Sequence, residues 1–76
     1  MMYRFLMIIE PGNNNYSAYV PDLPGCIATG KTLEEVKVNM SQAIEMHIQG
    51  MLEDQEAVPV PQTTADYVEI SSLGSA

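Results

Sequence analysis

The chain has 76 residues, with ten acidic and three basic side chains and a formal net charge of −7. This length allows one small domain over residues 1–76, and we expect its ordered core to run from about residue 3 to residue 70. A domain of this size buries only roughly 60–65% of the surface that its unfolded chain exposes. We therefore expect marginal stability and association with a second copy or another partner.

The charge balance bears on the class of partner. Three cations cannot form the basic stripe that neutralises phosphates, which argues against direct binding of nucleic acid. An anionic membrane surface would repel the chain, whereas opposite charge would speed its encounter with a basic protein. The composition therefore favours a basic protein partner.

The cysteine count and the apolar runs bear on location and cofactors. The one cysteine, Cys26, rules out an internal disulfide, and no Cys/His cluster suggests zinc. The longest apolar stretch, Phe5–Ile9, is too short for a membrane span and lacks the pattern of a signal peptide. We therefore expect a cytoplasmic protein without a cofactor, in which Cys26 is a core residue rather than a nucleophile.

Three short strands are predicted in the first half of the chain. Tyr3–Ile9 is apolar on both faces, which is typical of a central strand. A turn of Gly and Asn residues follows, and Tyr16–Val20 then completes an antiparallel hairpin. After a rigid loop over residues 21–25, Cys26–Thr29 is predicted as the third strand.

One clear helix is predicted to begin after Thr32 and to run to about Leu52 or Glu53. Thr32 and Glu35 form a capping box, in which the Thr hydroxyl accepts from the Glu35 amide and the Glu35 carboxylate reaches back. Gly50 lies inside the helix and weakens its last turn. The apolar residues of the helix fall on one stripe: Leu33, Val36, Met40, Ala43, Ile44, His47 and Met51.

Beyond the helix, Thr63–Ile70 has the composition of a fourth strand. The element order is then β-β-β-α-β, an α+β domain with a three-stranded antiparallel meander, a fourth strand and one helix on one sheet face. The opposite face would carry Leu6 and Ile8 from the first strand. We expect a second copy or a partner to cover that face.

Two segments resemble a known family. The first is YVPDLPGC at residues 19–26, followed by GKTLEE at residues 30–35, and the second is AIEMHI at residues 43–48, followed by PVP at residues 59–61. Together they resemble the HicB family of antitoxins, over about residues 3–70. This resemblance implies a partial RNase H-like fold with the same order of elements.

The resemblance also implies a function. HicB family members bind and neutralise HicA, a small basic toxin that cleaves mRNA and has a fold like that of double-stranded-RNA-binding domains. Full-length members add a C-terminal DNA-binding domain and repress their own operon. No such domain lies within these 76 residues, so the resemblance does not extend to autorepression.

An RNase H-like fold also invites a nuclease hypothesis. Two-metal chemistry needs clustered carboxylates, but the predicted first strand has none in its middle, and Glu10 lies only at its end. We assign no catalytic, cofactor or metal residue. The leading hypothesis is a non-enzymatic antitoxin or interaction domain that occludes a basic HicA-like toxin. Two alternatives stay open: a degenerate domain with weak metal-dependent hydrolase activity, and a stand-alone homo-oligomeric scaffold.

Candidate partner-binding residues come from three places. Tyrosine is favoured at interfaces, and a rigid loop loses little entropy on binding, although an Asp in such a loop is also a good turn former. Acidic residues on the helix suit a basic partner, whereas His47 on the apolar stripe is expected to be a core histidine. The predicted partner-binding residues are Tyr19, Asp22, Leu23, Glu34 and Glu45.

Overall fold

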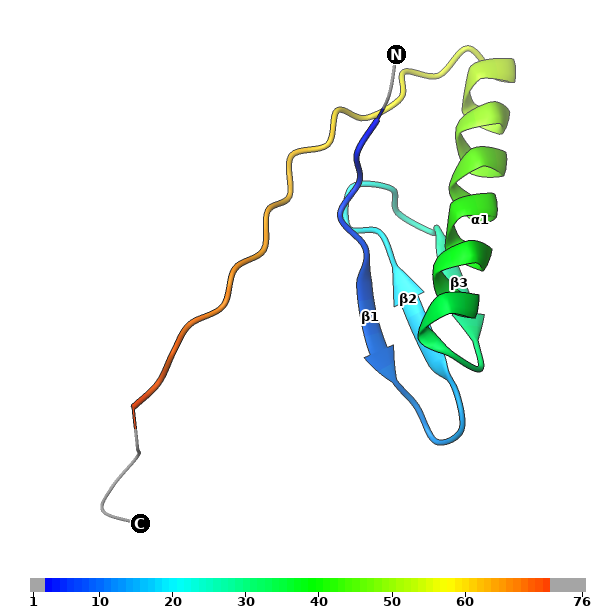
Figure 1. The fold of residues 1–76 in the computed structure, drawn as a ribbon. Coiled ribbons are helices and arrows are strands. Elements are labelled where there is room, and N and C mark those ends of the chain that lie inside the picture. The colour runs from blue at the N-terminus through cyan, green and yellow to red at the C-terminus, as the bar shows by residue number, and fades with distance from the viewer. Residues whose placement is uncertain (1–2, 72–76) are drawn as a thin grey trace.

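A computed structural model describes residues 3–71 of the chain. Three strands and one long helix follow one another along the chain (Figure 1). The strands are β1 (Ile8–Pro11), β2 (Tyr16–Tyr19) and β3 (Ile27–Gly30), and the helix is α1 (Leu33–Glu53). The structure thus confirms an α+β domain with an antiparallel meander and one helix.

The sheet has the strand order β1-β2-β3, with both pairs antiparallel. The prediction that the first strand is central was therefore wrong among the described residues, because β2 occupies the centre and β1 forms an edge. The apolar character of both faces of β1 has another cause, since one face packs on the core and the other forms part of an open sheet face.

The strands are also displaced from their predicted bounds, and β1 begins five residues later than expected. Its first residue, Ile8, pairs with Tyr19, the last residue of β2. Beyond Tyr19 the chain enters the loop at residues 21–25, where prolines remove backbone donors. Residues 3–7 consequently have no strand opposite them and are extended but unpaired.

Helix α1 begins and ends with local hydrogen bonds. The Glu35 amide donates to Thr32 Oγ1 at 3.0 Å, as the capping box predicts, but Glu35 Oε1 accepts from the Lys31 amide at 2.7 Å. The reciprocal bond thus reaches one residue further back than expected. At the other end, the Glu56 amide donates to the Met51 carbonyl and the Gln55 amide to the Leu52 carbonyl. This is a Schellman motif, with Gln55 in the left-handed region at φ 58°.

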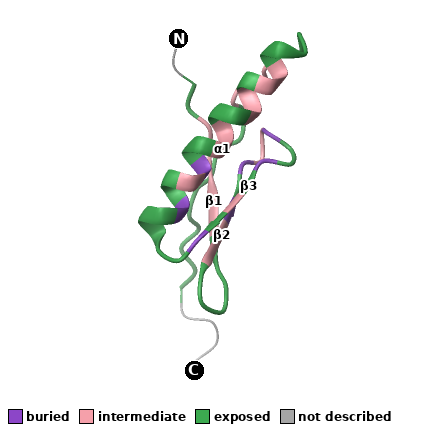
Figure 2. Ribbon diagram, turned by 90° about the vertical axis from the view of Figure 1, so that its right-hand side faces the viewer, coloured by how far each residue is buried: buried purple, intermediate pink, exposed green. Residues whose placement is uncertain are grey.

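The core lies between the sheet and the helix, as the buried positions in Figure 2 show. It confirms the predicted core role of Cys26, whose thiol lies 3.8 Å from Met40 Sδ. Leu33 of the predicted stripe is 42% exposed instead. Six buried residues form the core: Ala18, Val20, Leu23, Cys26, Val36 and Met40.

The last residue of β3, Gly30, makes this packing possible at the start of the helix. A Cβ atom at Gly30 would lie 2.5 Å from the backbone nitrogen of Val36 and 2.8 Å from its Cα. Only a residue without a side chain allows so close an approach between strand and helix. The glycine therefore lets the first turn of α1 press directly against the sheet.

The predicted fourth strand is absent from the described residues. Thr63–Ile70 is extended (Figure 1) but forms no strand pairing with any other described segment. We call residues 54–71 the tail, and Figure 1 shows it crossing the end of the domain and then running away from it. Strand-forming residues alone do not make a strand, because the ladder also needs a partner edge at the right distance.

Candidate protein interface

The outer face of the sheet, which is the face opposite α1, carries an apolar row. Ile8 pairs with Tyr19, and Tyr19 pairs with Ile27, so their side chains lie side by side on the same face. Tyr19 is 44% exposed and Ile27 is 66% exposed. We call the row Ile8, Tyr19 and Ile27 the outer patch. It is the uncovered face that the sequence led us to expect.

The loop between β2 and β3, residues 21–25, is held to the domain by one buried side chain. Leu23 is only 1% exposed and packs in the core, so its side chain does not reach the surface in this structure. Gly25 adopts φ 85°, a left-handed conformation that glycine accepts without strain. The loop is thus fastened to the domain by the leucine at its centre.

The carboxylate of Asp22 holds the tail. Asp22 Oδ2 accepts from the amides of Gln62 and Thr63, each at 3.0 Å, and Asp22 Oδ1 accepts from the Thr63 hydroxyl at 2.8 Å. The bonds from Thr63, first from its amide and then from its hydroxyl, lower the pKa of the Asp22 carboxyl below its ordinary value. Asp22 therefore anchors a segment forty residues further along the chain.

The acidic helix residues lie apart from the outer patch. Glu34 and Glu45 are both exposed on α1, and α1 packs on the other face of the sheet from Tyr19. The structure therefore does not bring the five predicted partner-binding residues together on one surface. One face offers the apolar outer patch, and the helix offers acidic charge.

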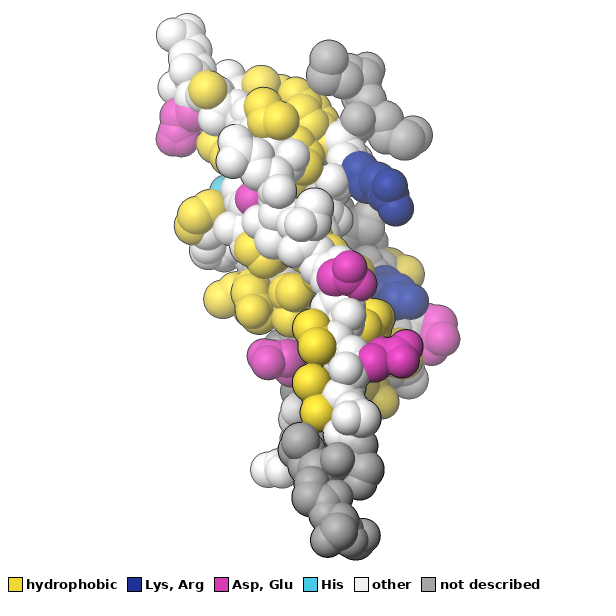
Figure 3. All heavy atoms as spheres, turned by 90° about the vertical axis from the view of Figure 1, so that its left-hand side faces the viewer, with side chains coloured by type: hydrophobic (Ala, Val, Ile, Leu, Met, Phe, Trp, Pro, Cys, Tyr) yellow, Lys and Arg dark blue, Asp and Glu magenta, His cyan; other side chains and the backbone are white. Residues whose placement is uncertain are grey.

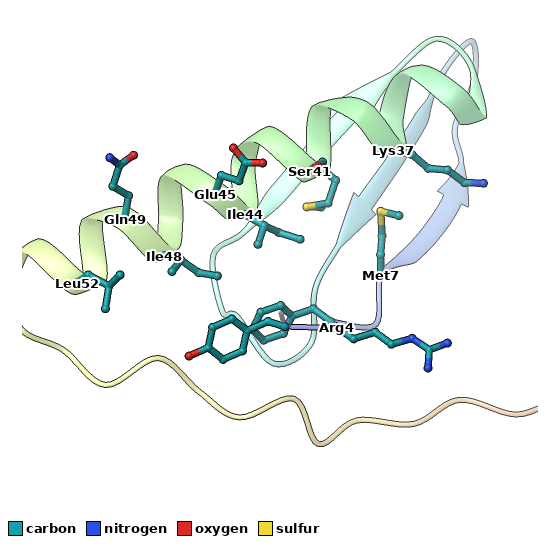
Figure 4. Close-up of a pocket in the computed structure, with 12 residues that line it drawn as sticks. Arg4, Met7, Lys37, Ser41, Ile44, Glu45, Ile48, Gln49 and Leu52 are labelled. Atoms are coloured by element: carbon teal, nitrogen blue, oxygen red, sulfur yellow. The ribbon is translucent and has the colours of Figure 1, made fainter. Parts of the chain in front are cut away.

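A groove lies between residues 3–7 and helix α1 (Figure 4). Its volume is about 730 Å³. Arg4 and Lys37 are toward one end of the groove, and Leu52 and Ile48 are toward the other. We call this space the helix groove. Its lining is mostly apolar: Tyr3, Arg4, Phe5, Met7, Lys37, Met40, Ser41, Ile44, Glu45, Ile48, Gln49 and Leu52.

Sequence reasoning missed the helix groove and the tail anchor. The anchor joins Asp22 to Gln62 and Thr63 across the whole helix, and no local pattern links such distant residues. One signal for the groove was available, because two of the three cations, Arg4 and Lys37, lie beside apolar residues of the first strand and the helix.

The titratable groups within the described part of the chain offer little for catalysis. Nowhere in residues 3–71 do three His, Cys, Asp or Glu side chains gather closely enough to hold a metal ion. Burial raises the pKa of the Cys26 thiol, which disfavours the reactive thiolate. His47 is half-buried on the helix. In this same span, no helix has the length and apolar character needed to cross a membrane.

Residues 3–71 form a small α+β domain, in which one face of the antiparallel meander packs on a helix and the other face is open. The same arrangement occurs in a solved chain of the HicA3 and HicB3 toxin–antitoxin complex, with a TM-score of 0.68 and 23% sequence identity over 79% of this chain and 70% of that one. The model of the HicB-like antitoxin family of bacterial toxin–antitoxin systems matches residues 5–72. The chain belongs to this family.

Sequence relatives come from a virus, bacteria and an archaeon. A 14.9 kDa protein of Haemophilus phage HP1 is 45% identical over 79% of this chain, which spans only 45% of that protein. A UPF0150 protein of Helicobacter pylori is 45% identical over 64% of this chain and 67% of its own length. A UPF0150 protein of Thermoplasma acidophilum is 33% identical over 71% of this chain and 78% of its own length. The chain thus spans less than half of the phage protein and more of the others.

Proposed function

We propose that this chain acts without catalysis, by binding a basic HicA-like toxin and occluding the surface with which that toxin cleaves mRNA. The observation that carries the proposal is the match of nearly the whole chain to the HicB-like antitoxin family. The net charge of −7 supports it, since it would attract a basic protein. Such a toxin acts on mRNA, so the proposal places the chain in the cytoplasm.

The outer patch is the docking surface in this proposal. It is apolar and contains an exposed tyrosine, the type of side chain that anchors many interfaces. Tyr19 thus keeps the role that the sequence suggested. Glu34 and Glu45 act at longer range, where their charge speeds encounter rather than tightening the final contact. Leu23 fixes the loop beside this patch to the core, and Asp22 holds the tail.

A titration of the chain with a HicA-like protein encoded beside it tests the proposal. We expect binding that is tightest at low salt, where charge attraction is least screened, together with loss of the toxin's RNA cleavage. No binding at low salt would contradict the proposal. So would binding that leaves cleavage unchanged, because occlusion requires that RNA be excluded.

A matched pair of variants tests the docking surface. Ile27→Arg places a cation in the outer patch, whereas Val38→Arg places one on the helix, and the native side chains are 66% and 57% exposed. We expect Ile27→Arg to weaken toxin binding by at least about tenfold. Val38→Arg should have a much smaller effect. Equal effects would move the docking surface away from the sheet.

Nothing in the described residues favours the hydrolase alternative. The carboxylates of Glu10, Glu45 and Asp66 belong to no metal-binding group within residues 3–71. Calorimetric titration of the chain with Mg²⁺ or Mn²⁺ separates the two functions, because a degenerate nuclease would bind a divalent ion and an occluding antitoxin would not need one.

A further inference from the structure

The tail leaves its apolar side chains in water. Tyr67 is 96% exposed, Val68 is 79% exposed and Ile70 is 65% exposed, although all three are residues that favour strands. The chain is held at Gln62 and Thr63 by Asp22, and from there the tail runs away from the rest of the domain (Figure 1). These side chains are therefore not covered by any of residues 3–71 of their own copy.

The helix groove is an apolar surface that is also open. Phe5, Ile44 and Ile48 line it from two sides, and the tail of the same copy does not fill it (Figure 4). Figure 3 views the molecule from the side on which β1 forms the sheet edge, and hydrophobic side chains gather there in several patches. Along this edge β1 has no strand partner among the described residues, so its outward backbone groups are free to pair.

Charge and polarity match between the groove and the tail. Arg4 and Lys37 lie toward one end of the groove, and Ile48 and Leu52 lie toward the other. Glu45 and Gln49 also line the groove, but their polar ends point away from the side on which Arg4 lies. In an extended segment, Asp66, Val68 and Ile70 point to one side, so they present an acidic end followed by two apolar residues.

The lengths also agree. Asp66 and Ile70 are about 13 Å apart in an extended chain. The helix rises about 22 Å from Lys37 to Leu52. With Asp66 beside Lys37, residues 66–70 therefore fit within the helix groove and end between Ile44 and Ile48, so that Val68 and Ile70 lie against its apolar middle.

We propose that two copies of this chain exchange tails, with residues 66–70 of each copy occupying the helix groove of the other. The exchange is reciprocal, because every copy carries one groove and one tail, so it closes as a two-fold symmetric dimer. The Asp22 anchor directs the tail away from its own domain and so favours a second copy over its own groove. The dimer leaves the outer patch free and does not depend on the proposed toxin.

Sedimentation velocity over a range of concentrations tests the exchange on the full chain without toxin. We expect the wild-type chain to dimerise and Val68→Asp to raise the dimer dissociation constant by at least about tenfold. Val60→Asp is the matched control, because Val60 is 68% exposed on the tail but precedes the anchor. It should change the constant by less than about twofold. Equal effects of the two variants would overturn the proposal.

A charge exchange between two variants gives the sharper result. Lys37→Glu and Asp66→Lys should each dimerise at least about tenfold more weakly than wild type, because each puts like charges together. In a mixture of the two variants, the native Asp66 of one variant meets the native Lys37 of the other, and the two substituted side chains, which also have opposite charges, meet in the second contact. A heterodimer should therefore form and appear in native mass spectrometry. Lys31→Glu is the control for charge alone, since Lys31 lies outside the groove.

Three outcomes would overturn the exchange. They are a mixture without heterodimer, a dimer that is insensitive to Val68→Asp, and a wild-type chain that stays monomeric at all concentrations. In the last case, protection of the Val68 amide from hydrogen exchange would identify the copy's own tail as the occupant. None of these measurements involves a toxin, so failure here leaves the proposed function untouched.

Discussion

Similar apolar side chains are buried in residues 5–53 and exposed in the tail. Val20 and Val36 in the first region are at most 2% exposed, whereas Val60 and Val68 in the tail are 68% and 79% exposed. The long axis of the molecule is 57 Å and its radius of gyration is 15.8 Å, against about 11 Å for a compact chain of this length. Hydrophobicity alone therefore does not decide burial, because a segment also needs a surface to pack against.

The helix supplies that surface for the first region. Residues 5–53 close a meander onto α1 through short connections, so every strand meets the helix or a neighbouring strand. The tail follows the helix and meets the domain again at the side chain of Asp22. Five further measurements would sharpen or break this contrast.

The largest expected effect concerns the loop leucine. Leu23→Ala should lower the free energy of unfolding by about 2–5 kcal/mol, because it opens a cavity in the core. Val60→Ala in the tail should change it by less than about 0.5 kcal/mol. Urea unfolding at a fixed protein concentration measures both. Similar losses would mean that the tail belongs to the cooperative unit after all.

The next effect compares two glycines. Gly30→Ala should destabilise the chain by about 1–3 kcal/mol, because the new methyl group meets the backbone of Val36. At Gly50 a Cβ atom has no neighbour within 4 Å. Gly50→Ala should therefore stabilise the chain by up to about 1 kcal/mol through helix propensity. Thermal unfolding of both variants should give shifts of opposite sign.

A smaller change in the free energy of unfolding is expected at the junction between helix and tail. Gln55 holds a left-handed conformation at φ 58°, so Gln55→Gly should raise the free energy of unfolding by about 1 kcal/mol. The same change inside the helix, Gln49→Gly, should lower it by about 1 kcal/mol. Circular dichroism during urea unfolding distinguishes them. A loss at both positions would show that the Schellman motif does not persist in solution.

The smallest change in stability is expected at the tail anchor, where the effect is on order instead. Asp22→Asn should increase hydrogen exchange at the Gln62 and Thr63 amides, because it removes the charge that these amides favour. Glu56→Gln is the control, since it also removes a negative charge from the tail but lies before the anchor and outside residues 66–70. Unchanged protection in Asp22→Asn would contradict the anchor.

The anchor should also respond to pH. The pKa of Asp22 is lowered when the tail is bound, so the contribution of the anchor is fully present above the ordinary Asp pKa. It is lost as the pH falls through the lowered value. Release of Gln62 and Thr63 should therefore begin below pH 3.8, the ordinary value, and be complete only below the lowered pKa. Side-chain carboxyl chemical shifts, followed by NMR, report both events.

The local signals in the sequence predicted the elements well where their cause is local. The helix runs from Leu33 to Glu53 because the cap at Thr32 and the apolar stripe both lie within it. The hairpin between β1 and β2 follows from its turn residues. Prediction was wrong at the bounds of β1 and for the fourth strand, since both depend on which segment lies opposite.

For the candidate interface residues, the sequence indicated which side-chain types suit an interface but not which of them lie at the surface. Tyr19 is exposed as expected, whereas Leu23 is buried by the turn that also positions Asp22. The helix groove needs residues from two distant segments, such as Phe5 and Ile48, and no spacing along the sequence brings these together. Burial and grooves are therefore properties of packing.

The α+β class, the long capped helix, the negative charge and the membership of the HicB-like antitoxin family could all be read from the sequence. The edge position of β1, the hold of Asp22 on the tail and the exposure of the tail's apolar end required the folded structure. The physical reason is the distance along the chain over which each interaction acts. Capping and amphipathic periodicity act over a few residues, whereas strand pairing and burial depend on which distant surfaces meet in space.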